Sequence, residues 1–251
     1  MPNINNYNYR ISISGSKLET YVSCPYKYYL SFVRNIKPAH KGKSPSLAFD
    51  QALHKTLSAF YSTHNRNEPF DQQNLISLLY SNWNANEYES TEQSDEFKKT
   101  AVEALNNYFL NYCQGKDRHI ETDYFFKEAI FSIQYSGRID RIDKNPDDTI
   151  DLIIYKTGKL PDGGVTELEQ SLSVQMLFFV AYQLWPKAVN KITYIYLKAN
   201  KKLVVYRDVN VLAAAKEKLL EILNAINNNK FPAQRSVSCS WCDHQDSCPV
   251  G

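Results

Sequence analysis

The last thirteen residues of the chain contain three cysteines at the spacing C-x2-C-x5-C, namely Cys239, Cys242 and Cys248. Closely spaced thiolates are costly to hold together without a cation, so this spacing indicates a soft-metal site. The whole chain has five cysteines in 251 residues, which is too few for a disulfide-framed fold. We therefore interpret the cysteine tail as a metal-binding segment.

A tetrahedral metal site requires a fourth ligand, and the sequence offers two candidates. His244, which lies inside the tail, would complete a zinc site. Cys24, near the other end of the chain, would instead complete a four-thiolate site. The residues alone leave both alternatives open. The fifth cysteine, Cys113, ends an aromatic and helix-like stretch, and we expect it to be a buried, inert thiol.

A second group of reactive side chains lies in the middle of the chain. Residues 137–143 read Gly-Arg-Ile-Asp-Arg-Ile-Asp, and residues 151–159 read Asp-Leu-Ile-Ile-Tyr-Lys-Thr-Gly-Lys. Both segments are typical of β-strands, and the turn sequence Asn-Pro-Asp-Asp at 145–148 separates them. The pattern predicts two successive strands, of which the first carries Asp140 and the second ends near Lys156.

These two segments resemble the G-x-x-D and D-Y-K-T-G motifs of the PD-(D/E)XK nucleases, in particular the RecB and AddB nuclease domains and the CRISPR adaptation exonucleases. Residues 47–54 look like the helix that presents a metal-binding histidine, here His54. Gln175 and the four residues after it are similar to the Q-x-x-x-Y motif, with Phe179 in the tyrosine position. The resemblance implies an α/β fold with a PD-(D/E)XK restriction-endonuclease-like core, in which helices flank a mixed central sheet.

The resemblance extends to the cysteines and spans residues 14–248. One cysteine near the N-terminus and a C-x2-C-x5-C tail is the arrangement by which AddB-type nucleases hold a 4Fe-4S cluster. The resemblance thus implies that Cys24, Cys239, Cys242 and Cys248 bind such a cluster. It also implies an N-terminal helical region joined to the C-terminus through that cluster.

Phosphodiester hydrolysis requires a divalent cation to neutralise developing charge and to lower the pKa of the attacking water. Hard oxygen ligands suit Mg or Mn in this role. An ammonium group beside the scissile phosphate would orient the water or stabilise the oxyanion. The expected roles are metal ligation for His54 and Asp140, water or oxyanion contact for Lys156, positioning of substrate or water for Gln175, and phosphate contact for Arg138 and Arg141.

One position departs from the family pattern. The second acid of the family, which bridges the metal, falls where this chain has Ile154. Asp151 is not a simple replacement, because Ile154 and Lys156 share one face of the strand and Asp151 has the opposite parity. The site is therefore inactive, weakly active or rebuilt with another carboxylate. The candidates for that carboxylate are Glu128, Glu167 and Glu169.

The elements that position these residues follow from hydrophobic periodicity and turn sequences. We expect one domain over residues 1–251, with a helical region at 14–120, an α/β core at 121–230 and a cysteine tail at 237–251 paired with Cys24. A capping box, Ser16-x-x-Glu19, marks the first helix. Residues 83–97 are predicted to form a polar loop. The expected helices are 16–24, 46–63, 71–82, 94–113, 167–184 and 211–228, and the expected strands are 124–135, 137–142, 149–155, 191–197 and 203–208.

The net charge of +2 conceals an uneven distribution. Residues 1–66 carry nine Lys and Arg against two acids, and residues 186–236 carry ten against three. Residues 67–130 carry five against twelve. Two basic blocks could meet on one face and attract a polyanion such as nucleic acid, although solvated helix faces would give the same count.

Two functions are consistent with these features. The first is an iron-sulfur DNA-processing protein of the metal-dependent exonuclease type. The second is a catalytically inactive DNA-binding or scaffolding subunit of a DNA repair, CRISPR adaptation or defence complex, beside a helicase or CRISPR integrase-type partner. Residues 1–10 are polar, and the longest apolar run, 176–185, is too short to span a bilayer. We therefore expect a cytoplasmic protein without membrane contact.

Overall fold

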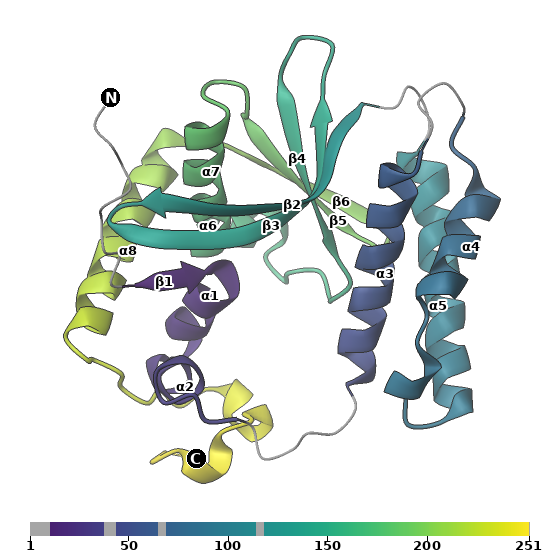
Figure 1. Cartoon of the computed structure of the whole chain (residues 1–251). Helices are drawn as coiled ribbons and strands as arrows, with labels where there is room; N and C mark the ends of the chain where they lie inside the picture. Colours follow the sequence, from purple (N-terminus) through teal and green to yellow (C-terminus); the bar gives the residue numbers. More distant parts are fainter. Residues whose placement is uncertain (1–10, 38–43, 65–68, 114–117, 251) are drawn as a thin grey trace.

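A mixed sheet runs through the computed structural model, which describes residues 11–37, 44–64, 69–113 and 118–250 (Figure 1). The polar segment 1–10 lies outside the described residues. The strands are β1 (Ser12–Ser14), β2 (His119–Ile130), β3 (Ile133–Lys144), β4 (Ile150–Lys156), β5 (Lys191–Tyr196) and β6 (Lys201–Tyr206). The long strand β3 pairs in parallel with β1, and it pairs antiparallel with β2 and β4. Strand β5 pairs in parallel with β4, and β6 pairs antiparallel with β5.

Helices cover both faces of this sheet, as expected for the predicted α/β fold (Figure 1). One layer consists of α3 (Pro45–Ser62), α4 (Gln72–Asn82) and α5 (Thr91–Tyr112). The other layer contains α1 (Gly15–Ser23), α7 (Leu172–Leu184) and α8 (Val209–Asn227). The shorter elements are α2 (Pro25–Tyr28), the π-helix η2 (Tyr29–Val33), α6 (Gly164–Gln170), and the 3-10 helices η3 (Ala85–Glu87), η4 (Val237–Trp241) and η5 (Gln245–Ser247).

Strand β4 contributes to both hydrophobic cores, because its side chains alternate between the two layers. Leu152 and Ile154 pack into the core beneath α1, α7 and α8. Ile153 and Tyr155 pack into the core beneath α3, α4 and α5. A strand that is buried on both faces reads as a continuous apolar run, which explains its sequence.

Helix α3 is held against the sheet by apolar side chains at helical spacing. Leu53, Leu57 and Phe60 are almost fully buried. Pro45 occupies the first turn, where its missing N–H costs nothing. His54 directly follows Leu53 and is half-buried at the margin of the packed face. The packing of α3 therefore fixes where His54 meets the sheet.

The expected strand 124–135 is wrong, because the chain reverses at Phe131 and Ser132. Both residues have positive φ angles, +48° and +67°. A two-residue turn of this kind joins β2 to β3 as a hairpin. Such turns normally contain Asn or Gly, and the apolar Phe131 concealed this one.

Two helix boundaries also differ from the prediction. The side chain of Ser14, not Ser16, caps α1. Glu19 instead accepts hydrogen bonds from Ser171 Oγ and from the Ser173 N–H, so it caps α7 across space. Ser171 itself has an extended backbone, which divides the expected helix 167–184 into α6 and α7.

The polar stretch 83–97 is only partly a loop. Ser90 caps α5, which begins at Thr91.

In the part of the chain that the structure describes, no helix is long and apolar enough to cross a membrane.

Candidate active site and cysteine pocket

His54 of α3 and Asp140 of β3 form a direct contact. His54 Nδ1 lies 2.8 Å from Asp140 Oδ1. The other carboxylate oxygen of Asp140 accepts the backbone N–H of Tyr155 at 2.8 Å. The regular β3–β4 pairing runs only from Arg141 to Lys144, so the two strands part at Asp140. Because the strands part there, the carboxylate of Asp140 accepts the Tyr155 N–H, which a backbone carbonyl of a paired strand would otherwise accept.

A second carboxylate lies on the other side of the His54 ring. Asp50 Oδ1 is 3.5 Å from His54 Nε2 and accepts the hydroxyl of Thr157 at 2.6 Å. Neither Asp50 nor Thr157 was predicted from the sequence to be a site residue. Their detectable features were the i, i+4 spacing of Asp50 and His54 on one helix and the position of Thr157 next to Lys156.

The charges of the two carboxylates determine the ionisation of His54. Burial alone would lower the pKa of His54, but the hydrogen bonds to Asp140 and Asp50 and their charges raise it to about 10. The hydrogen bond from His54 lowers the pKa of Asp50, although partial burial opposes this. In the metal-free protein at neutral pH, the ring is therefore a cation between Asp140 and Asp50.

This group lines a groove with a volume of about 530 Å³ between α3 and the β2–β3 hairpin. Arg138 of β3 is half-exposed in its wall and forms an ion pair of 2.6 Å with Asp123, and its contact with phosphates stays a prediction. The groove is lined by Asp50, Gln51, His54, Lys55, Ser58, Ala59, Ser62, Asn82, Asp123, Arg138 and Asp140.

Lys156 is exposed at the end of β4, next to this group. Its ammonium lies 5.9 Å from the centre of the Tyr194 ring, and its charge contributes to the lowered pKa of Asp50. The residue before Lys156 donates its N–H to Asp140, and the residue after it donates its hydroxyl to Asp50. The backbone at Lys156 is thus fixed relative to both carboxylates.

The structure does not bring Gln175 to the groove. Gln175 is buried in α7, and its Nε2 donates to the carbonyl of Glu169 at 2.6 Å. Its Oε1 accepts no hydrogen bond from the described residues. In this arrangement the side chain bridges the break between α6 and α7, and contact with a substrate stays a prediction.

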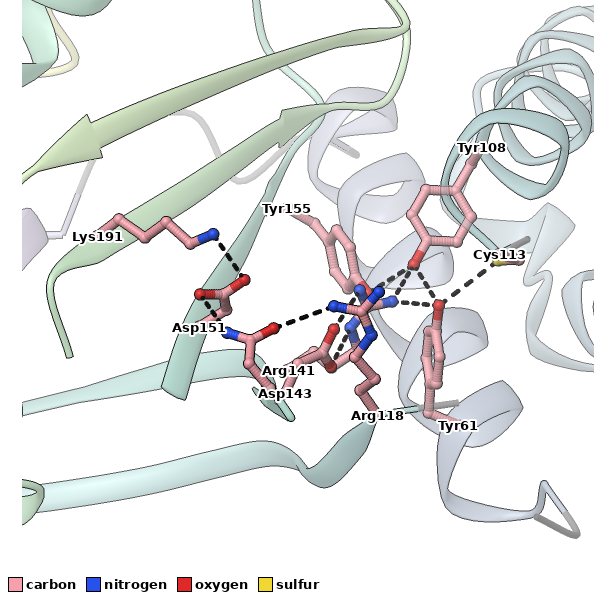
Figure 2. Close-up of polar contacts among 10 residues, drawn as sticks. Tyr61, Tyr108, Cys113, Arg118, Arg141, Asp143, Asp151, Tyr155 and Lys191 are labelled. Atoms are coloured by element: carbon pink, nitrogen blue, oxygen red, sulfur yellow. Dashed lines mark hydrogen bonds and ion pairs between the residues drawn. The ribbon is translucent and has the colours of Figure 1, made fainter. Parts of the chain in front are cut away.

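The expectation that Arg141 contacts phosphates is wrong, because its guanidinium is buried and is engaged by the polar side chains drawn in Figure 2. It donates to the hydroxyls of Tyr61 and Tyr108 and to the carboxylate of Asp143. The Tyr108 hydroxyl also pairs with that of Tyr155 at 2.9 Å. This network joins α3, α5, β3 and β4 directly behind Asp140, so it supports the site from within the protein.

The four cysteines expected at one metal site line a single pocket. Cys24 reaches it from the start of α2, and Cys239, Cys242 and Cys248 reach it from the tail. All four are free thiols with partly exposed side chains. His244 also lines the pocket, but its Nε2 lies 2.8 Å from Ser31 Oγ. Cys113 is buried elsewhere, as predicted.

A comparison with protein-family models matches the PD-(D/E)XK nuclease superfamily over residues 12–249. The chain belongs to this superfamily. The fold of this PD-(D/E)XK protein is similar to the crystal structure of a presumed exonuclease from Eubacterium rectale. The TM-score is 0.53 at 14% identity, over 96% of this chain and 93% of that chain.

A more remote similarity links this PD-(D/E)XK protein to the crystal structure of SSO0001. It has a TM-score of 0.36 and 16% identity, over 81% of this chain and 97% of that one. No curated protein matches the chain.

In this PD-(D/E)XK protein, an apolar residue occupies the position where the family pattern has its second acid. Ile154 is buried in the apolar core. Asp151 faces the opposite layer, as its parity predicted, and pairs with Lys191 at 3.1 Å (Figure 2). None of the three glutamates that we considered lines the described groove. Glu128 binds Gln183, Glu167 binds the N–H of Gly163, and Glu169 contributes its carbonyl to Gln175.

A divalent ion at His54 and Asp140 would have to displace the proton that lies between His54 Nδ1 and Asp140 Oδ1, because a cationic imidazole has no free lone pair for a metal. In the described part of the chain, no three His, Cys, Asp or Glu side chains converge as ligands of one ion. Mg²⁺ in phosphate chemistry is often held by one or two carboxylates, with water and substrate completing its shell. Once the proton is displaced, Nδ1 and Oδ1, which lie 2.8 Å apart, would be two neighbouring ligands, and water and substrate would supply the others.

Proposed function

We propose that this chain is a metal-dependent deoxyribonuclease of the exonuclease type. The contact between His54 and Asp140 in the wall of the groove, beside Lys156, is the observation that carries the proposal. Membership of the PD-(D/E)XK nuclease superfamily supports it, and so does the fold shared with the Eubacterium rectale protein.

The side chains of the site divide the chemical work. A bound Mg or Mn would neutralise charge on the scissile phosphate and activate a water molecule. His54 and Asp140 would hold that ion, and Asp50 keeps the His54 ring in place from its other side. Lys156 would donate to the phosphate oxygen on which charge develops. Arg138 would hold a neighbouring phosphate of the strand.

We also propose that the four cysteines bind a 4Fe-4S cluster. The support is that Cys24 and the three tail cysteines line one pocket as free thiols. Four thiolates are the usual ligand set of a 4Fe-4S cluster, in which each thiolate would bind a different iron. Backbone N–H groups of Lys27 and Ser236 already point at the sulfurs of Cys24 and Cys239, at 3.5 and 3.3 Å.

A second candidate function is DNA binding without hydrolysis, as a scaffolding subunit. The observation that favours it is Ile154, because an apolar core residue has replaced a metal-bridging acid. The two candidates share the groove and differ only in whether the site cleaves the strand that it binds.

A nuclease assay separates the two candidates. Linear single- and double-stranded DNA would be incubated with Mg²⁺ or Mn²⁺ and wild type, Asp140→Asn or Asp95→Asn. The last variant removes an equal charge from α5, outside the residues that line the groove. A nuclease loses activity in Asp140→Asn and retains it in Asp95→Asn. A wild type that binds DNA but does not cut it would establish the scaffold, and residual cutting shared by all three proteins would indicate a contaminant.

A further inference from the structure

Phe125 of β2 is an aromatic residue that the fold leaves uncovered. Its side chain is 55% exposed. The next residue, Phe126, faces the opposite side of the strand and is buried against Gly137. Strand alternation therefore directs Phe125 outward, on the face from which Arg138 enters the groove.

The ring of Phe125 is held beside the groove by its cross-strand partner. Phe125 and Arg138 are opposite each other in the β2–β3 pair. The Arg138 guanidinium carbon lies 5.6 Å from the centre of the ring, and Arg138 is itself fixed by its ion pair with Asp123. Arg138 also lines the groove together with His54 and Asp140. The aromatic ring is thus one side chain away from the candidate catalytic pair.

Besides Arg138, two further cations lie on the same strand face or in the same groove. Lys127 is exposed two residues farther along β2, on the same face as Phe125. Lys55 lines the groove from α3. An exposed aromatic ring among cations that follow a groove is the combination with which proteins bind single-stranded nucleic acid, since bases stack on the ring and phosphates pair with the cations.

We propose that Phe125 stacks an unpaired base of a single DNA strand whose phosphates pass Arg138 into the groove. The inference rests on the proposed function, because it takes DNA to be the substrate. A base inside a duplex is already stacked on both faces, so it has no free face for the ring. Phe125 therefore favours a strand with an unpaired end over a blunt duplex.

The test is a fluorescence anisotropy titration with a labelled single strand of about 20 nucleotides and with its blunt duplex, in EDTA to prevent cleavage. The variants are Phe125→Ala, Phe125→Trp and the matched control Tyr206→Ala. Tyr206 is 65% exposed on β6, away from the groove residues. Phe125→Ala should weaken single-strand binding about 5- to 150-fold, because loss of one base stack costs about 1–3 kcal/mol. Phe125→Trp should bind like wild type, and Tyr206→Ala should change the affinity less than about twofold.

The outcomes separate this inference from the proposed function. A Phe125→Ala variant that binds the single strand like wild type would overturn the stacking role and leave the nuclease proposal standing. Equal losses on single strand and duplex would also overturn it, since a general change in folding or in the shape of the groove acts on both. A wild type that binds neither DNA would reject the proposed function itself. Unchanged melting temperatures show that the variants remain folded.

Discussion

His54 Nδ1 and Asp140 Oδ1 lie 2.8 Å apart, although 86 residues separate them in the chain. The contact joins helix α3 to strand β3 where β3 and β4 part. It depends on the packing of α3 and on the Tyr155 N–H that holds the other oxygen of Asp140. A change at either support should therefore be measurable at the site.

Lys156→Ala should lower the turnover number for DNA cleavage about 100- to 1000-fold, because it removes a charge that stabilises the developing oxyanion. Lys159→Ala is the matched control, as it removes an equal charge three residues farther along. Cleavage of a labelled DNA strand at saturating substrate concentration measures the turnover number of both variants. Comparable losses in the two variants would reduce the role of Lys156 to general attraction of DNA.

Asp50→Asn should lower the pKa of His54 in metal-free protein. The pKa is about 10 in the folded state against 6.5 for the unperturbed ring. A raised histidine pKa stabilises the fold fully below pH 6.5, and this contribution is lost as pH rises through about 10. Urea unfolding across that range and NMR titration of the ring in EDTA measure the effect. Asp123→Asn should leave the titration unchanged, and an unchanged His54 in Asp50→Asn would contradict the assignment.

Gly137→Ala should destabilise the protein by about 1–3 kcal/mol through overpacking. A Cβ at this position would lie 2.7 Å from Cζ of Phe126. The glycine of the G-x-x-D motif thus makes room for a buried ring on the neighbouring strand. Gly158→Ala is the control, since a Cβ there meets nothing within 4 Å. Urea denaturation measures the free energy of unfolding of both variants. Equal values would show that the Phe126 ring moves aside without cost.

Tyr108→Phe should lower the free energy of unfolding by about 1–3 kcal/mol, because it leaves buried polar partners unpaired. The lost hydroxyl contacts Arg141, Tyr61 and Tyr155. Tyr112→Phe, one turn along the same helix, should cost less than about 0.5 kcal/mol. Denaturant melts compare the two, and a neutral Tyr108→Phe would mean that water replaces the hydroxyl.

Cys24→Ser should lose most of the iron and sulfide of anaerobically purified protein and lower its melting temperature by several degrees. Its thiolate would connect the N-terminal helices to the tail through the cluster. Cys113→Ser should keep the iron, because Cys113 lies outside the cysteine pocket. Colourless, zinc-bearing wild type would reject the iron-sulfur proposal, and a Cys24→Ser variant with wild-type iron would exclude this residue as a ligand.

Much of the fold and part of the site followed from local sequence. The helix 46–63 and the strand 149–155 were predicted within a residue or so of their ends, because apolar spacing and turn residues agree there. The β2–β3 turn was missed because its sequence, Phe-Ser, lacks the residues that usually adopt positive φ. Glu19 was predicted to cap its own helix, α1, whereas it caps α7. A cap made across space leaves no local sequence pattern.

The sequence by itself, through the resemblance of its motifs, indicated the superfamily, the neighbouring strands that carry Asp140 and Lys156, and the grouping of Cys24 with the cysteine tail. Motifs depend on residue types and their order along the chain, and strand parity shows only which side chains share a face. Only the tertiary structure decided that Asp50 and Thr157 adjoin His54, that Arg141 is buried rather than exposed, and that Ile154 faces an apolar core. Parity states which side chains share a face, whereas the helices packed on that face decide whether it is a core or a site.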